Sequence, residues 1–288
     1  MISDITLGQF FPGYSVLHRL DPRTKIIAAA LAIATVFVAS TPVSFIMLAA
    51  ITLILIGVSR ISYKVIWRGI KPIVMILVIT SLINLFMTVG EGEPLLDFWI
   101  FTVYSEGIVR AIFMTVRVVI LIVVSSLLLT YTTSPISLTD GIESLLSPLK
   151  RIGVPVHTFA MMMSIALRFI PTLIEETEKI MNAQKSRGAD FTSGSLVSRA
   201  KALVPLLIPL IISSFNRAEE LATAMECRCY RGDNNRTKLV KLEYKLRDAL
   251  AVLVGILVLG AVILLNRLVS LGIIGSYGGV IDFLFMKI

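Results

Sequence analysis

Long apolar runs separated by short charged segments occupy most of the chain. Pro72–Val89 and Ala249–Leu265 contain no charged residue, and Ile108–Tyr131 is mostly apolar. A membrane-spanning helix needs about 20 apolar residues, so each run predicts one span. The longer apolar stretch Ile26–Val58 is interrupted by Pro42, which predicts two short spans joined by a tight turn. The pattern therefore predicts five spans.

The chain end after Arg267 is apolar and rich in glycine. Two interpretations remain open for it. It is either the end of the last span followed by an interfacial tail, or a sixth, weak span.

Between the fourth and fifth spans lies a polar insert, Thr132–Lys245, which is too long to be a simple connecting loop. It contains three helical patterns. The first starts at a capping cluster of Ser137, Thr139 and Asp140 and stops at Gly153. The other two cover His157–Arg187 and Leu196–Arg231, and the last is expected to close at Gly232.

The two long helical patterns share a layout. In each, the first half is apolar, the second half is charged, and proline lies near the change. The charged half of Leu196–Arg231 carries a narrow seam of apolar and small residues spaced by four and three. Such a seam is typical of a helix face that another helix or a groove approaches closely. Either the two charged halves pack only on each other, or their ends also enter a partner. The seam residues are Ile211, Phe215, Ala218, Ala222, Met225 and Cys229.

Composition and charge place these helices in a membrane. The chain is 56% hydrophobic and 16% charged, whereas soluble domains are about a quarter charged. Its net charge of +8 comes mainly from basic residues beside the spans, which argues against nucleic-acid binding. The N-terminal segment is basic, with Arg19, Arg23 and Lys25, and so are the loop at residues 60–71 and the insert. The loop "GEGEPLLD" between the third and fourth spans is acidic. This alternation predicts a cytoplasmic N-terminus and a cytoplasmic insert.

The two cysteines, Cys227 and Cys229, form a lone C-x-C with no further ligands nearby, so we expect small helix residues and no metal site. The carboxylates of the insert lie near Lys and Arg on polar helix faces, which is the usual solvated pattern. No G-x-x-x-x-G-K-[ST] phosphate loop is present. We therefore expect no catalytic residue, no cofactor and no ATP site in this chain.

Both long helical patterns end on an arginine between small residues: Ser186-Arg187-Gly188 in one and Cys227-Arg228-Cys229 in the other. Helix capping alone explains either triplet, since glycine stops helices and a cation is favoured in the last turn. Two such ends in one insert also present two guanidinium groups, whose rigid forks suit the carboxylates of a partner.

Several further residues are candidates for packing or interface roles. "LDPRTK" is either a turn with Arg23 and Lys25 at the lipid headgroups or a specific packing element. Arg117 lies inside a span and is expected to face protein rather than lipid. The methionine run suits an adaptable surface or an ordinary core, and a core is the simpler expectation. The candidates are Asp21, Arg23, Arg117, Met161, Met162, Met163 and Arg231.

Three motifs, "SVLHRLDPRTKI", "AQKSRGAD" and "RAEELATAMECRCYRGD", resemble signatures of a known family. The family is the energy-coupling factor (ECF) transporter transmembrane component, the T subunit of ECF-type ABC importers, and the likeness covers the whole chain. Ser186 stands where the family usually has alanine, and Cys227 and Cys229 replace its small neighbours. Aligning "MECRCYRG" with the family's "MEARGYRG" makes Arg228, rather than Arg231, the second key arginine.

The resemblance implies an all-α integral membrane protein with about five transmembrane helices and a cytoplasmic helical coupling module whose two long helices cross. The expected divisions are residues 1–131 with spans one to four, the coupling module at 132–245, and the last span with its tail at 246–288. Each triplet arginine would dock in one of two ABC ATPase subunits. The motion of these subunits would make a substrate-binding S component release its vitamin or metal ion inward.

The expected location is the plasma membrane of a bacterium or archaeon, with a multi-pass chain. Two alternatives stay open: a conventional ABC permease that lines its own substrate pathway, and a membrane-embedded enzyme. Because substrate specificity in this family lies in the S component, the sequence predicts no particular substrate.

Overall fold

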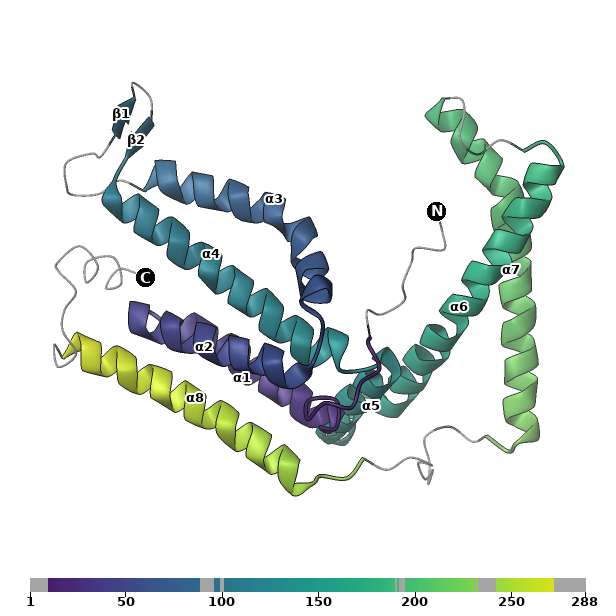
Figure 1. Cartoon of the computed structure of the whole chain (residues 1–288). Helices are drawn as coiled ribbons and strands as arrows, with labels where there is room; N and C mark the ends of the chain where they lie inside the picture. Colours follow the sequence, from purple (N-terminus) through teal and green to yellow (C-terminus); the bar gives the residue numbers. More distant parts are fainter. Residues whose placement is uncertain are drawn as a thin grey trace. The chain divides into compact units, whose positions relative to one another are not determined.

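A computed structural model describes residues 10–88, 96–98, 101–189, 191, 195–230, 232 and 242–271. Within them the protein is all-α apart from one short antiparallel hairpin (Figure 1). A π-helical segment, Ser126–Tyr131, continues α4, and a 3-10 segment, Ser147–Ile152, continues α5. The elements are α1 Pro22–Val38, α2 Pro42–Ser59, α3 Tyr63–Met87, β1 Leu96–Phe98, β2 Phe101–Val103, α4 Ser105–Ser125, α5 Pro135–Leu146, α6 Val156–Ser186, α7 Leu196–Cys227 and α8 Leu246–Ser270.

The chain forms two compact units. The first, which we call the core unit, comprises residues 10–134 and 242–288, and contains α1 to α4 and α8. The second, the inserted unit, comprises residues 1–9 and 135–241, and contains α5, α6 and α7. The inserted unit thus interrupts the sequence of the core unit between α4 and α8.

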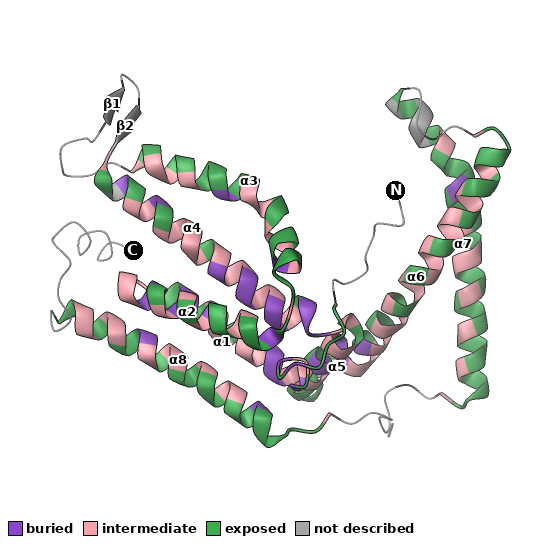
Figure 2. Cartoon of the chain, viewed as in Figure 1, coloured by how far each residue is buried: buried purple, intermediate pink, exposed green. Residues whose placement is uncertain are grey.

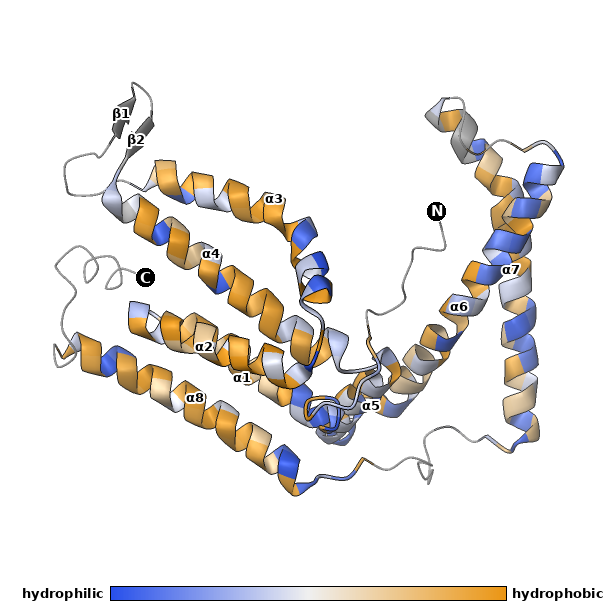
Figure 3. Cartoon of the chain, in the orientation of Figure 1, coloured by the Kyte–Doolittle hydropathy of each residue, from blue (hydrophilic) through white to orange (hydrophobic). Residues whose placement is uncertain are grey.

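Among the described residues, six helices are long and apolar enough to cross a membrane: α2, α3, the α4 region Gly107–Tyr131, α6, the α7 region Lys201–Cys227, and α8. Together they show an integral membrane protein of the all-α class, as predicted, whereas the five predicted spans included α1 and neither α6 nor α7. With 17 residues, α1 is shorter than these six helices. Large apolar side chains point outward on the helices of the core unit, as expected for surfaces that face lipid, among them Ile46, Met75 and Leu257. Figure 3 shows the mostly apolar colouring of these helices.

The apolar core of the core unit lies between α1, α2, α4 and α8. Buried residues such as Ala29, Leu48, Ile120 and Val262 form it. A second cluster, which includes Ile66 and Tyr131, packs α3 against α4 and its π-helical continuation. Figure 2 shows that buried positions concentrate in these helices. This arrangement holds the ends of α1 and α8, described below, in fixed positions.

Several boundaries differ from those predicted. The loop after α3 holds the hairpin, with Leu96 paired to Val103, Asp97 to Thr102 and Phe98 to Phe101. The predicted capping cluster does not start α5, because the helix begins at Pro135 and the Thr139 hydroxyl donates to the Pro135 carbonyl. The predicted end of the last long helix at Gly232 is also wrong, as shown next. The predicted tail after Arg267 lies, beyond residue 271, outside the described residues.

Candidate functional site

The end of α6 is a Schellman motif. Arg187 is the C-cap, Gly188 follows in the left-handed conformation at φ +88°, and the two closing hydrogen bonds are present. The Gly188 N–H donates to the Lys185 carbonyl at 3.0 Å, and the Ala189 N–H donates to the Gln184 carbonyl at 3.0 Å. These bonds fix the backbone of Arg187 and leave its side chain outside the helix.

The end of α7 has the same geometry. Arg228 follows the last helical residue, and Cys229 adopts the left-handed conformation at φ +57°. The Cys229 N–H donates to the Glu226 carbonyl at 2.8 Å, and the Tyr230 N–H donates to the Met225 carbonyl at 3.0 Å. Cys229 therefore closes this helix in place of a glycine, three residues before the predicted stop at Gly232.

The two ends correspond residue by residue. Ser186 matches Cys227, Arg187 matches Arg228, and Gly188 matches Cys229, and all six residues are exposed. Neither arginine side chain makes a hydrogen bond or ion pair within the part of the chain that the structure describes. The alternative arginine, Arg231, lies outside the described residues. The correspondence favours Arg228, rather than Arg231, as the residue equivalent to Arg187.

Glycine in place of either cysteine at the end of α7 should change the stability of that helix end, in opposite directions at the two positions. Cys229→Gly should strengthen the end of α7 by about 1 kcal/mol, because a side chain in this conformation costs roughly 1–2 kcal/mol that glycine avoids. Cys227→Gly should weaken the same end by about 0.5–1 kcal/mol, since Cys227 is helical. Hydrogen exchange of the Tyr230 amide should therefore slow about fivefold in the first variant and quicken in the second. Faster exchange in Cys229→Gly would contradict the motif.

The seam on α7 is not used between α6 and α7. Phe215 is 71% exposed and Ile211 is 52% exposed, and Ala218 and Ala222 are exposed as well. The interpretation in which the two charged halves pack only on each other is therefore wrong for this face. An uncovered apolar face on a polar helix commonly marks an interaction site.

Instead, α6 and α7 are joined by a polar contact. The Glu176 carboxylate accepts a hydrogen bond of 2.7 Å from the Ser213 hydroxyl and pairs with the Arg217 guanidinium. Glu176 is one of the insert carboxylates for which the sequence predicts only the solvated pattern, and its contact with a second helix adds to that prediction. The two long helices are thus held to each other at a charged, directional point.

A second polar centre joins the starts of α1 and α8 in the core unit. The buried Asp248 side chain accepts the Asp21 N–H through Oδ1 at 2.8 Å and the Lys245 N–H through Oδ2 at 2.8 Å. Asp21 in turn is the N-cap of α1 and accepts the Arg23 N–H at 2.9 Å. One carboxylate therefore caps α8 and holds the start of α1.

Arg23 and Lys25, the basic residues of the segment "LDPRTK", do not both lie at the surface. Lys25 is 2% exposed, and its Nζ donates to the Thr132 carbonyl at 2.7 Å. The interpretation of Lys25 as a headgroup anchor is therefore wrong. Arg23 lies over the Tyr244 ring, with 5.1 Å between its Cζ and the ring centroid.

Arg117 closes the turn between α1 and α2. Its guanidinium donates to the Ala39 carbonyl at 2.9 Å and lies over the Phe45 ring. Asn266 of α8 donates to the neighbouring Val38 carbonyl at 2.8 Å. The carbonyls at the end of α1, which lack partners within the helix, thus receive donors from two other helices.

The methionine run lies on the surface of the inserted unit. Met162 and Met163 are exposed, so the expectation of an ordinary core is wrong for them, whereas Met161 is partly buried. No group of three metal-ligating side chains occurs among the residues that were described. Cys227 and Cys229 are free cysteines and are exposed.

Residues 13–239 match the family model CbiQ, described as cobalt transport protein. The chain belongs to this family. Similar relatives are called energy-coupling factor transporter transmembrane protein EcfT. The Clostridium kluyveri protein is 52% identical over 93% of this chain and 98% of the relative. The Acidaminococcus fermentans protein is 54% identical over 88% of this chain and 94% of the relative. The Bacillus subtilis protein is 46% identical over 93% of this chain and 100% of the relative.

Family membership confirms the resemblance that the three motifs predicted. The chain is a transmembrane component of an ECF-type transporter, and hence a membrane subunit of a transport system. The sequence located the two arginine triplets and raised a packing role for the segment around Lys25, but it predicted none of the long-range contacts of Lys25, Glu176 and Asp248. These partners lie 107, 41 and 227 residues away in the chain, where no local pattern indicates them.

Proposed function

We propose that this chain is the coupling scaffold of an ECF-type importer. It transmits the ATP-driven motion of two ATPase subunits to a substrate-binding S component that takes up a vitamin or a metal ion. The observation that carries the proposal is the matched pair of helix ends, which present Arg187 and Arg228 in the same backbone geometry. Two equivalent ends suit two similar ATPase subunits.

In this proposal each arginine enters an acidic groove of one ATPase. The Schellman hydrogen bonds hold the arginine backbone rigid, so little backbone entropy is lost on docking. The small flanking residues Ser186, Gly188, Cys227 and Cys229 let the groove walls approach each guanidinium. The exposed seam of α7 extends the contact surface along the helix.

The Glu176–Arg217 contact supports transmission between the two long helices. Because it joins α6 to α7, displacement of one helix is passed to the other instead of being lost by separation. The exposed Met162 and Met163 and the apolar halves of α6 and α7 supply an adaptable surface for the S component.

The proposal includes an orientation in the membrane. Basic residues flank the spans on the side of the N-terminus and of the insert, and such residues favour the cytoplasm. We therefore place the N-terminus and the coupling module, residues 132–245, in the cytoplasm, between the membrane segments 1–131 and 246–288. The cavity of the core unit is lined almost entirely by apolar residues, which favours a scaffold over a permease with its own polar pathway.

Reconstitution tests the proposal. The purified chain, mixed with the two ATPase subunits and the S component of the same cell, should form one complex with two ATPase chains, measured by size-exclusion chromatography with light scattering. Vesicles containing that complex should take up substrate with ATP. The chain alone should neither hydrolyse ATP nor bind the substrate. Substrate binding by the chain alone would show that it acts as a conventional permease.

A further inference from the structure

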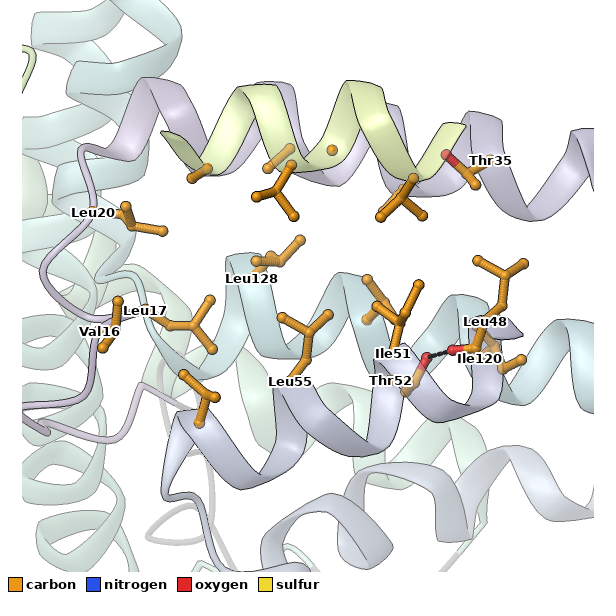
Figure 4. Close-up of a pocket in the computed structure, with 18 of the residues that line it drawn as sticks. Val16, Leu17, Leu20, Thr35, Leu48, Ile51, Thr52, Leu55, Ile120 and Leu128 are labelled. Atoms are coloured by element: carbon orange, nitrogen blue, oxygen red, sulfur yellow. Dashed lines mark hydrogen bonds between the residues drawn. The ribbon is translucent and has the colours of Figure 1, made fainter. Parts of the chain in front are cut away.

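A cavity of about 490 Å³ lies inside the core unit, between α1, α2, α4 and α8 (Figure 4). Its wall is apolar except for two threonines and one arginine. The Thr35 hydroxyl donates to the Leu31 carbonyl at 2.6 Å, and the Thr52 hydroxyl donates to the Leu48 carbonyl at 2.7 Å. Because both hydroxyls are already engaged, the wall suits a hydrocarbon occupant and not a polar one.

The cavity is elongated along the helices. On α8 it extends from Arg247 to Val258, a rise of about 16 Å at about 1.5 Å per residue. The hydrocarbon core of a bilayer is about 30 Å thick, so one leaflet contributes about 15 Å. The cavity is therefore about as long as the hydrocarbon layer of one leaflet is thick.

One side of the cavity is open. The inner wall, which includes Val36 and Leu128, is buried, whereas Val58 of α2 and Leu250 and Val254 of α8 are exposed. The opening thus lies between α2 and α8. Farther along, these helices are joined by the Ser44 hydroxyl, which donates to Asn266 Oδ1 at 2.9 Å. A hydrocarbon chain can enter through the opening between α2 and α8, and the Ser44–Asn266 contact blocks it at the far end.

The helices around the cavity leave no room for another helix. α1 packs on α4 and α8, and α2 packs on α4 and joins α8 at Ser44, so the four helices surround the cavity except at the opening. A helix with its side chains is about 10–12 Å across and would have to separate these helices. A flexible hydrocarbon chain fills the space without such a change.

Arg247 lies at the charged end of the cavity and is the single charged residue of its lining. It is exposed, and it makes no hydrogen bond or ion pair with the residues described in the structure. In the adjacent carboxylate, Asp248, each oxygen accepts one backbone N–H, from Asp21 and from Lys245. A guanidinium at the mouth of an apolar slot complements a phosphate attached to a hydrocarbon chain.

We propose that this cavity binds one acyl chain of an anionic phospholipid, whose phosphate pairs with Arg247. The lipid fills the space between α2 and α8 and so completes the packing of the core unit. This site is independent of the coupling function proposed above, since it uses neither arginine triplet and no residue of the inserted unit.

Native mass spectrometry of the full chain tests the proposal. The chain is delipidated in mild detergent and then supplied with phosphatidylglycerol or phosphatidylcholine. The wild type should retain one phosphatidylglycerol per chain more firmly than phosphatidylcholine. Val254→Trp, which fills the slot, should lose it. Arg247→Ala should lower retention of phosphatidylglycerol about tenfold, to the level of phosphatidylcholine.

Two matched variants serve as controls. Leu264→Trp places the same bulk on an exposed position of α8 outside the cavity, and Lys64→Ala removes another exposed cation. Both should bind lipid like the wild type. Equal lipid retention in Val254→Trp and Leu264→Trp would overturn the proposal. Release of the lipid on assembly with the S component would also overturn it, because the slot would then belong to that partner.

Discussion

Reversing both arginines in an Arg187→Glu/Arg228→Glu variant should abolish stable association with the ATPase subunits, and substrate uptake with it. Removing one partner of a desolvated charge pair typically costs about 2–5 kcal/mol, which weakens binding by roughly 30- to 5,000-fold. Reversal would add repulsion from the proposed acidic groove. The two sites lie on separate helices, so both losses apply in the double variant.

Pull-down with the ATPase pair and uptake by reconstituted vesicles measure the effect. Each single variant should retain one docked ATPase and lose most transport. Lys179→Glu is the matched control, because Lys179 is an exposed cation on α6 that precedes the helix end by two turns. Arg187→Lys keeps the charge but loses the rigid fork and should show an intermediate loss. Unchanged assembly in the double variant would refute docking through these arginines.

The second large effect is expected at Asp248. Asp248→Ala leaves the buried Asp21 amide and the part-buried Lys245 amide without acceptors, and an unsatisfied buried group costs about 1–3 kcal/mol. It also removes an anion from the surroundings of the buried Lys25. We expect the free energy of unfolding to fall by about 3–5 kcal/mol, with a decrease of the unfolding temperature on the order of 10 °C.

Thermal unfolding in detergent, followed by circular dichroism, measures this loss. Asp248→Asn retains one side-chain oxygen as acceptor and should lose about half as much stability. Glu243→Ala removes an exposed carboxylate five residues earlier and should leave the unfolding temperature nearly unchanged. If Asp248→Ala unfolded like Glu243→Ala, the capping role would be wrong.

The sequence predicted the helices of the core unit well because their signal is local. Apolar runs show where each span lies, and Pro42 marks the turn between α1 and α2. The two arginine triplets were also visible, since each follows a periodic helix. The all-α membrane fold and the family followed from these short-range patterns.

The sequence did not predict contacts between distant segments. Lys25 resembles any basic residue beside a span, but its amine is buried against Thr132. Nothing local distinguishes Glu176 from its exposed neighbours, because its partners lie on another helix. The end of α7 was misplaced for a different reason: glycine is the usual left-handed residue, and here Cys229 takes that conformation three residues earlier.

The polar centre at the start of α1 has a mechanical consequence. Besides the junction after residue 9, the inserted unit joins the core unit covalently after Ser134 and before Leu242. Beside these points, Thr132 is bonded to Lys25, and Asp248 is bonded to Asp21. Both connections are therefore fastened to one turn of a single helix. A displacement of either connection would therefore act on the start of α1 as well as on the helix to which that connection leads.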